Sequence, residues 1–333
     1  MSGSWALKRA LYHSGLLALA RLARQRVRGV VLRYHALTDG EPAVPYAAPG
    51  ICLPVEAFRL QMAFVRRAYS VVPLDALVDA LAAGRPLPPR AVAITFDDGY
   101  ADNHRLGLPV LAGLGLTATV YVTTGPLDGG TPLWTSLLRA LVLGAPGPEL
   151  RVPGVDPVAL GTPAAREAAV RALTRALVPL AANDRAARLA AVASALGVGR
   201  EVAGAMLTTP QLRELAAAGW TIGAHTVSHP NVALATPADA EAEIAGSRDV
   251  LSAKIGTPVV HFAYPNTGGA HRYFDAPVAA LLRRLGFRSA VTSRPGALRP
   301  GADLFTLPRV GVSPRLAPVV ELATALERQR LAA

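Results

Sequence analysis

The chain alternates short apolar runs with longer amphipathic stretches. Each run is apolar through most of its length, which is typical of strands that are covered on both faces of a parallel sheet. We predict strands of this kind at 30–34, 92–96, 117–122, 220–224, 259–263, 288–292 and 305–312.

Helical patterns separate these runs. A strand followed by a helix, repeated about seven times, favours an α/β barrel over an open sheet. An open doubly wound sheet is the alternative, although no strand is followed by a Gly-x-Gly-x-x-Gly turn or a Gly-Lys-Ser/Thr loop. The helices are predicted at 55–67, 74–83, 101–114, 209–218, 237–255 and 275–285.

The repeat is interrupted between about residues 128 and 206, where no convincing strand occurs. The first part of this segment is rich in proline and glycine, and the Ala/Arg/Leu pattern of 164–196 predicts two surface helices. We therefore predict one domain over residues 29–333 that carries a helical insertion. The insertion could form a lid or a membrane-facing patch, or it could be a decoration without a part in the chemistry.

Residues 1–28 are predicted to form an amphipathic helix that could lie on a membrane. Its apolar positions are Trp5, Leu11, Leu16, Leu19 and Leu22. A cleaved signal peptide is the alternative, but His13 and Ser14 interrupt the apolar stretch. No apolar run approaches the ~20 residues of a bilayer-spanning helix. The predicted location is cytoplasmic or peripheral to a membrane, without a transmembrane helix.

The formal net charge of +11 comes almost entirely from arginine, since Lys8 and Lys254 are the only lysines. Such a balance suits an anionic partner, either a membrane surface or an acidic glycan, unless it only reflects codon bias. Nucleic acid is not expected, because the basic residues are scattered and aromatic residues make up only 5% of the chain. Cys52 is the single cysteine and cannot form an intramolecular disulfide.

Two adjacent carboxylates, Asp97 and Asp98, follow the strand predicted at 92–96 and precede Gly99. In a barrel they would lie at the carboxyl ends of the strands, where active sites form. Like charges so close raise one another's pKa, so a bound cation or a catalytic role would compensate them. A double-acid turn or a helix N-cap is the structural alternative.

Two histidines, His225 and His229, lie just beyond the strand predicted at 220–224. They can point both imidazoles at one ion if the residues between them make a helical turn. Two imidazoles and one carboxylate, here from the Asp97-Asp98 pair, suit a catalytic metal that keeps a position open for water. The sequence therefore predicts a divalent metal site, with zinc as first choice and cobalt, nickel or manganese as alternatives.

These motifs resemble those of the polysaccharide deacetylases that share the NodB homology domain. The Thr-Phe-Asp-Asp-Gly run at 95–99 is similar to the first motif of that family, and the His-Thr-Val-Ser-His run at 225–229 to its second. The resemblance covers roughly residues 29–312. It implies a distorted (β/α)7 barrel that hydrolyses N-acetyl groups on the amino sugars of a glycan.

The resemblance also implies roles for single residues. Asp97 corresponds to the catalytic base, and the metal ligands correspond to Asp98, His225 and His229. The Leu-Pro-Arg-Val run at 307–310 resembles a strand found near the end of one branch, the exopolysaccharide deacetylases.

The sequence departs from the family pattern in two places. The third motif, Phe-Ala-Tyr-Pro at 262–265, lacks the arginine that orients the base in many relatives. The Leu-x-His run that supplies the general acid has no counterpart after Phe305. His35 ends the first predicted strand, as in the same branch, and is our candidate for a polar site residue or for the acid. A structural histidine is the alternative.

Three further residues are candidates for substrate contacts. The backbone N–H of Tyr100 could stabilise an oxyanion. Trp134 and Tyr264 could stack on a sugar face, with core packing as the alternative for both. A metal-dependent N-deacetylase is the function expected, and an O-acetyl esterase or an inactive glycan-binding relative are the alternatives.

Overall fold

The computed structural model describes Ser14 and residues 29–40, 44–151, 157–196, 205–266 and 271–331. Apart from Ser14, the helix predicted at 1–28 lies outside this part of the chain, so that helix and its membrane contact stay predictions. Within the described ranges, no helix combines the length and the apolar character that crossing a membrane requires.

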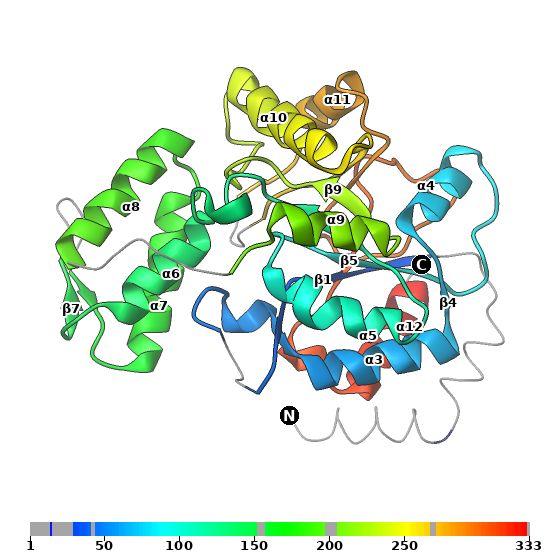
Figure 1. Cartoon of the computed structure of the whole chain (residues 1–333), viewed down its shortest axis with the longest axis horizontal. Coiled ribbons are helices and arrows are strands. Elements are labelled where there is room, and N and C mark those ends of the chain that lie inside the picture. Colours follow the sequence, from blue (N-terminus) through cyan, green and yellow to red (C-terminus); the bar gives the residue numbers. More distant parts are fainter. Residues whose placement is uncertain are drawn as a thin grey trace.

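Seven parallel strands form a curled sheet, in which the first six lie side by side in chain order and the seventh pairs with the first (Figure 1). Each strand overlaps one of the seven predicted runs, and a short additional strand, β4 (Ser70–Val71), pairs with the second of them. The seven are β1 (Val30–Tyr34), β5 (Ala91–Phe96), β6 (Thr119–Val122), β9 (Thr221–Ala224), β10 (His261–Ala263), β11 (Ser289–Val291) and β12 (Val310–Gly311).

The last segment of the chain in the sheet closes the barrel. Leu307 forms a parallel bridge to Val291 of β11, and a few residues later Val310 of β12 pairs with Leu32 of β1. The run predicted as one strand at 305–312 is therefore a bent segment that contacts both edges in turn. The predicted distorted α/β barrel is confirmed.

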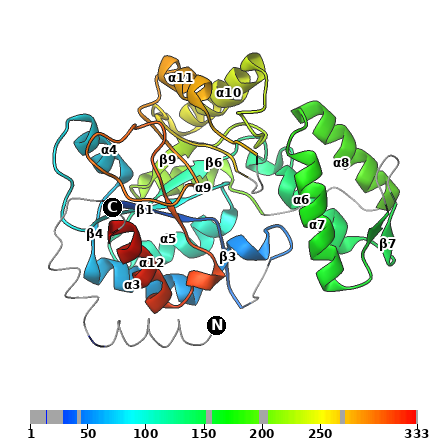
Figure 2. The same ribbon diagram turned by 180° about the vertical axis from the view of Figure 1, so that it is seen from behind.

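Helices cover the outside of the barrel (Figures 1 and 2). The predicted helix at 101–114 is divided into a π-helical turn, η2 (Asn103–Gly107), and α5 (Leu108–Ala112). A C-terminal helix, α12 (Val319–Leu331), was not predicted. The others are α3 (Val55–Ala68), α4 (Leu74–Ala82), α9 (Thr209–Ala217), α10 (Pro237–Ile255) and α11 (Ala276–Arg284).

Capping residues set where several helices begin and end. Helix α10 begins after Thr236, whose side chain accepts a hydrogen bond from the N–H of Asp239, and ends at Gly256 with φ of 73°. Glycine adopts this left-handed conformation without the steric cost of a Cβ atom. The bounds of α10 coincide with the prediction because both capping residues, Thr236 and Gly256, can be recognised in the sequence.

The strands are apolar on both faces because both faces are covered. Val30 and Leu32 belong to the large core between sheet and helices, while Val31 packs with Tyr121 in a second cluster. Gly223 of β9 allows that packing, since a Cβ atom there would lie 2.4 Å from the Tyr121 ring. Alternate residues of the strands thus point into the barrel. At the carboxyl ends of the strands, this direction decides which side chains can contact one another.

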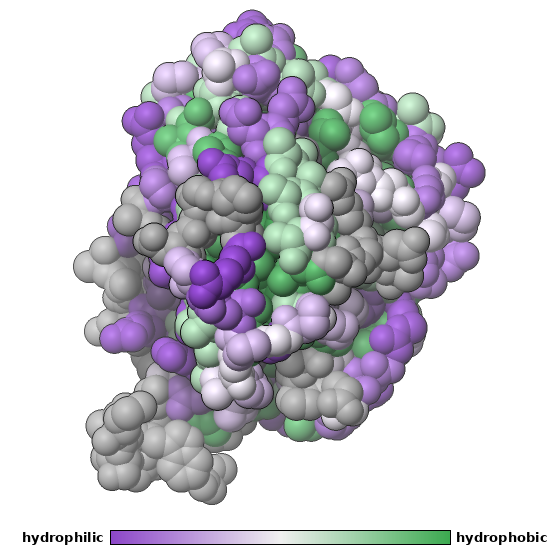
Figure 3. All heavy atoms as spheres, turned by 90° about the vertical axis from the view of Figure 1, so that its left-hand side faces the viewer, coloured by the Kyte–Doolittle hydropathy of each residue, from purple (hydrophilic) through white to green (hydrophobic). Residues whose placement is uncertain are grey.

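The segment between β6 and β9 forms a helical lobe beside the barrel (Figures 1 and 2). Its apolar side chains make a hydrophobic cluster of their own. Seen from its outer side, the lobe carries a narrow, moderately apolar strip with strongly hydrophilic side chains beside parts of it (Figure 3). The lobe contains α6 (Trp134–Gly144), which was not predicted, a hairpin of β7 (Glu149–Leu150) and β8 (Val158–Ala159), and the two predicted helices α7 (Pro163–Leu177) and α8 (Ala182–Leu196).

Candidate active site and metal centre

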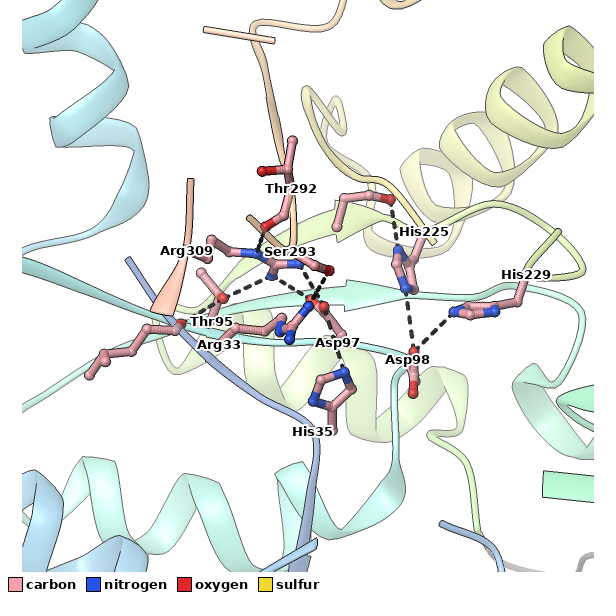
Figure 4. A network of polar contacts seen from close by, with 12 residues as sticks. Arg33, His35, Thr95, Asp97, Asp98, His225, His229, Thr292, Ser293 and Arg309 are labelled. Carbon is pink, nitrogen blue, oxygen red and sulfur yellow. Dashed lines mark hydrogen bonds and ion pairs between the residues drawn. The ribbon is translucent and has the colours of Figure 1, made fainter. Parts of the chain in front are cut away.

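The two carboxylates lie on a sharp turn directly after β5. The N–H of Asp97 still donates to the carbonyl of Tyr34 at 3.0 Å, which extends the pairing with β1. Asp98 and Gly99 then have φ of 75° and 85°. A non-glycine residue in this region costs of order ~1–3 kcal/mol, and such residues cluster at functional sites. The turn lets neighbouring side chains point to different partners (Figure 4).

The two histidines lie on the loop after β9. The helical turn expected between them is absent, and Thr226 and His229 instead have φ of 68° and 56°. The Thr226 hydroxyl accepts a hydrogen bond from the N–H of His229 at 3.0 Å. This side-chain contact stabilises a non-helical turn and returns His229 toward His225, so that their ring centroids are 4.9 Å apart.

The turn and the loop bring Asp98 and both histidines together. Asp98 Oδ1 lies 3.3 Å from His225 Nε2 and 3.4 Å from His229 Nε2. One ligand atom from each residue lies within 4.8 Å of the other two, and all three side chains are buried. Burial alone raises the pKa of Asp98, but its hydrogen bonds to the two imidazoles outweigh this and lower that pKa well below the ordinary value.

The donor atoms of this trio fit a divalent cation. His225 Nδ1 lies 2.7 Å from the Ala263 carbonyl oxygen, a contact that needs a proton on Nδ1. A cation between His225 Nε2 and Asp98 would replace the proton on Nε2 and bind its lone pair. His229 Nδ1 is buried without a hydrogen-bond partner among the described residues, whereas its Nε2 faces Asp98. Metal-binding histidines are commonly oriented in the way His225 is.

Glu243 of α10 holds the loop that carries the histidines. Its Oε2 atom accepts hydrogen bonds from the N–H groups of Val227 and Ser228, both at 2.8 Å, and its Oε1 accepts from the Ser228 hydroxyl at 2.6 Å. The carboxylate therefore compensates two backbone donors that no strand or helix satisfies. Nothing in the local sequence marked Glu243, because its role depends on the packing of α10 against the loop.

Replacing Glu243 with alanine is expected to weaken metal binding about 10- to 100-fold, the usual effect of removing a group that orients a ligand. The variant loses three hydrogen bonds that fix the loop between His225 and His229. Zinc affinity is measured by competition with a chromophoric chelator. Glu241→Ala is the matched control, since Glu241 lies on the same helix and pairs with Arg284 on the surface. Equal zinc affinity in the two variants would contradict the role of Glu243.

Asp97 binds an arginine and not the histidines. Both Asp97 oxygens accept hydrogen bonds from Arg309, at 2.6 and 2.7 Å, and Arg309 also donates to the Thr292 carbonyl at 2.9 Å (Figure 4). Burial opposes ionisation of Asp97, yet the charge of Arg309 prevails and the pKa of Asp97 falls to about 2. Such a two-pronged contact fixes the carboxylate in one orientation.

Arg309 answers the question left by the variant third motif. The third motif at 262–265 lacks an arginine, and no other arginine was predicted to orient Asp97. The 307–310 run that contains Arg309 was recognised only for its resemblance to a strand of one branch. Its guanidinium is fully buried and comes from the segment that closes the barrel. Because alternate residues of a strand point to opposite faces, the position of Arg309 in its strand could have indicated a side chain that points into the barrel. Only the closed barrel shows that this side chain contacts Asp97.

His35 lies beside Asp97 at the end of β1. Its Nε2 atom is 3.9 Å from Asp97 Oδ2, and its Nδ1 atom is buried without a hydrogen-bond partner among the described residues. Burial lowers the pKa of His35 to about 4, more than the two carboxylates raise it. Arg33, two residues earlier, donates to the Ser293 hydroxyl and points into the same region.

A cavity of about 510 Å³ opens over these groups. Asp97, Asp98 and both histidines line it, together with His35 and Tyr100. This volume lies within the range of small-molecule sites, about 300–1,000 Å³. Its opposite wall comes from the helical lobe, mainly from α7.

The two aromatic candidates for sugar stacking lie elsewhere. Tyr264 is 1% exposed, its hydroxyl donates to the Phe305 carbonyl at 2.9 Å, and its ring packs on Phe262 and Phe274. Trp134 is also buried, and its Nε1 atom donates to the His229 carbonyl at 2.9 Å. Neither ring lines the large cavity, so Trp134 supports the histidine loop and Tyr264 supports the core.

Two further histidines, His104 and His261, lie outside the cavity. His104 contacts Glu214 at 2.6 Å. His261 lies 2.8 Å from Ser289 Oγ and 2.7 Å from Asp75 Oδ1, distances that resemble a hydrolytic triad. However, His261 and Ser289 are fully buried at the first residues of β10 and β11, opposite to the end that carries Asp97. This trio therefore ties α4 to the sheet.

Comparison with known proteins adds the family to this geometry. The sequence profile of the family described as "Polysaccharide deacetylase" matches residues 84–142 and 173–290, just over half of the chain. The chain belongs to the polysaccharide deacetylase family. It is therefore a hydrolase that acts on N-acetyl amide bonds of carbohydrates, and the family resemblance of the motifs is confirmed.

Individual relatives are distant. The protein named "Putative polysaccharide deacetylase YxkH" of Bacillus subtilis (strain 168) is 21% identical over 286 residues, which cover 85% of this chain and 71% of YxkH. The deacetylase PplD of Streptococcus pyogenes is 19% identical with a TM-score of 0.60, over 90% of this chain and 99% of PplD. IcaB from Ammonifex degensii is 20% identical with a TM-score of 0.58, over 91% of this chain and 98% of IcaB. At such identities the solved structures establish the fold.

Proposed function

We propose that this deacetylase is a metal-dependent N-deacetylase of glycans, with Asp98, His225 and His229 as the metal ligands. One observation carries the proposal: three ligand atoms from two distant loops lie within 4.8 Å of one another, beside the Asp97 carboxylate. Two imidazoles and a carboxylate suit zinc, with cobalt, nickel or manganese as alternatives. When bound, such an ion lowers the pKa of water and polarises the acetyl carbonyl.

Asp97 is the base in this proposal. It accepts a proton from the water that attacks the acetyl carbon, a role that requires an ionised carboxylate held beside the ligands. Arg309 provides both conditions, because it pairs with the two carboxylate oxygens and its charge favours the ionised form. The oxyanion that forms on the acetyl group is assigned to the backbone N–H of Tyr100.

His35 is our candidate for the group that protonates the leaving amine. As the C–N bond breaks, the nitrogen needs a proton. His35 Nε2 lies 3.9 Å from Asp97 Oδ2, beyond hydrogen-bond reach, so the proton taken up by Asp97 passes to His35 through one bridging water. Because the pKa of His35 is lowered to about 4, the imidazole is neutral at the start and can receive that proton. The chain has no histidine after His271, so its C-terminal segment cannot supply an imidazole for this step.

The relatives support an N-acetylated glycan as the substrate. The PplD structure is a complex with acetate, the product of both N- and O-deacetylation, and a solved relative from Aggregatibacter actinomycetemcomitans is named a de-N-acetylase. The missing C-terminal histidine favours a second candidate, hydrolysis of O-acetyl esters at the same site, because an alkoxide leaves with less protonation than an amine. Both candidates use the same ligands and the same base.

Acetate release from matched N-acetyl and O-acetyl oligosaccharides tests the proposal. We expect release from the N-acetyl oligosaccharide, its loss after treatment with a chelator, and its recovery when zinc, cobalt, nickel or manganese is added. Release from the esters alone would replace the N-deacetylase by the second candidate. Full activity in the chelated protein would remove the metal from the proposal.

A further inference from the structure

The wall of the cavity opposite the ligands is one face of helix α7. Its lining residues recur at spacings of three and four, as on a single helix face. They are Glu167, Val170, Arg171, Thr174 and Arg175. The insertion therefore shares a cavity with the metal ligands, and the charges of this helix face the space that a substrate would occupy.

A buried ion pair holds this wall in place and neutralises Glu167, the only acidic residue among those of α7 that line the cavity. Arg139 of α6 binds both oxygens of Glu167, at 2.8 and 2.6 Å, and its side chain is only 5% exposed. The pair joins α6 to α7. The Nε atom of Arg139 is buried without a partner among the described residues, and Arg139 itself lines the cavity.

Arg171 and Arg175 remain as positive charges without a carboxylate of their own. Both are exposed at the cavity, and neither forms an ion pair with a described residue. Glu167, the acid on the same helix face, is already held by Arg139, and Arg171 acts on Glu167 through its charge alone. Arg33 adds a guanidinium on the barrel side of the same cavity, where it donates to Ser293. Arginines thus face the cavity from both walls.

Aromatic stacking does not account for recognition here. Apart from the histidines, the aromatic side chains that line the cavity in the described part of the chain are Tyr46 and Tyr100. Tyr100 is 1% exposed, and Tyr46 donates its hydroxyl to Asp102 at 3.0 Å. A neutral sugar would find little aromatic surface, whereas guanidinium groups bind phosphate and carboxylate groups with charge-assisted hydrogen bonds.

We infer that Arg171 and Arg175 form a subsite for an anionic group, so that the substrate is an acidic N-acetylated glycan carrying a phosphate or a carboxylate near the acetylated sugar. This inference rests on the proposed deacetylase site, because the subsite places the anion in the same cavity as Asp97 and the ligands. It also gives the insertion a part in binding.

The test compares glycans that differ only in charge. The probes are a neutral N-acetylglucosamine oligomer, the same oligomer carrying a phosphate ester, and an oligomer of equal length that alternates N-acetylglucosamine with glucuronic acid. We expect the double variant Arg171→Gln/Arg175→Gln to lower the kcat/KM ratio of acidic over neutral glycan at least about tenfold, mostly through KM. Arg59→Gln/Arg188→Gln is the control, with the same change of net charge at arginines outside the cavity.

The two acidic probes distinguish a phosphate subsite from a carboxylate subsite. A preference for neutral glycan in the natural sequence, or an equal loss of selectivity in the control, would overturn the inference. Binding of each acidic glycan by calorimetry keeps the subsite testable if no glycan releases acetate. In that case the proposed function fails, while weaker binding by the double variant would still support the subsite and equal binding would reject it.

Discussion

His225→Ala and His229→Ala are each expected to lose the bound metal and to lower the rate of acetate release by about 10³-fold or more. An ion that polarises the carbonyl stabilises the transition state by several kcal/mol, and each 1.4 kcal/mol corresponds to about a factor of ten in rate. Removing either imidazole leaves two of the three ligand atoms that lie within 4.8 Å of one another. Metal content is measured by mass spectrometry on the purified variants, beside acetate release.

Two other histidines provide matched controls for this experiment. His104 contacts Glu214 outside the cavity, and His271 lines a small neighbouring pocket with Trp134 and His229 but does not line the large cavity. His104→Ala and His271→Ala should keep a near-stoichiometric metal. Thermal unfolding of all four variants separates loss of metal from loss of fold. Unchanged metal content in both His225→Ala and His229→Ala would remove the foundation of the proposed function.

Asp97→Asn is expected to lower kcat by about 10² to 10⁴-fold, the range that general base catalysis contributes, while the metal stays bound. The amide occupies the same volume but cannot accept the proton of water. Its carbonyl oxygen can still accept one hydrogen bond from Arg309, although the second contact is lost. Steady-state kinetics and metal analysis of the same preparation check this outcome.

The Asp97→Asn variant also affects Arg309, because it leaves the buried guanidinium of Arg309 partly unpaired. Breaking a buried pair by removing one partner typically costs about 3–5 kcal/mol of stability, so thermal unfolding accompanies the kinetics. Arg309→Lys keeps the charge but not the two-pronged contact, and should lower kcat less than Asp97→Asn does. If the two residues act as a unit, the double variant is no slower than Asp97→Asn. A folded, metal-loaded Asp97→Asn protein with kcat within tenfold of the natural sequence would exclude Asp97 as the base.

Much of the fold follows from local sequence patterns. The seven apolar runs each contain a strand, and α10 begins and ends where Thr236 and Gly256 indicate. Such features depend on residues a few positions apart, so the hydrophobic pattern and the capping residues report them directly. Helices α6 and α12 were not predicted. Both contribute side chains to their clusters through packing with segments far along the chain.

Some features of the candidate site could also be predicted from local sequence, and others could not. The spacing of the Asp97-Asp98 pair and of the two histidines indicated the candidate site, because residue types and their close neighbours are enough to suggest metal ligands and a base. The left-handed backbone conformations of Asp98, Thr226 and His229, with φ between 56° and 75°, could not be predicted from the sequence. Non-glycine residues keep this conformation only where the surrounding structure holds them in it.

By itself the sequence determined the class of fold and the positions of the seven strands along the chain, and it singled out the four side chains that the structure brings together. Only the tertiary structure decided which residues support them. Arg309 is 212 residues from Asp97, and Glu243 reaches the histidine loop from a helix that packs on it. Contacts of this kind arise when the barrel closes and the helices dock. The direction of each side chain then depends on strand register and helix rotation, which no local pattern of residues specifies.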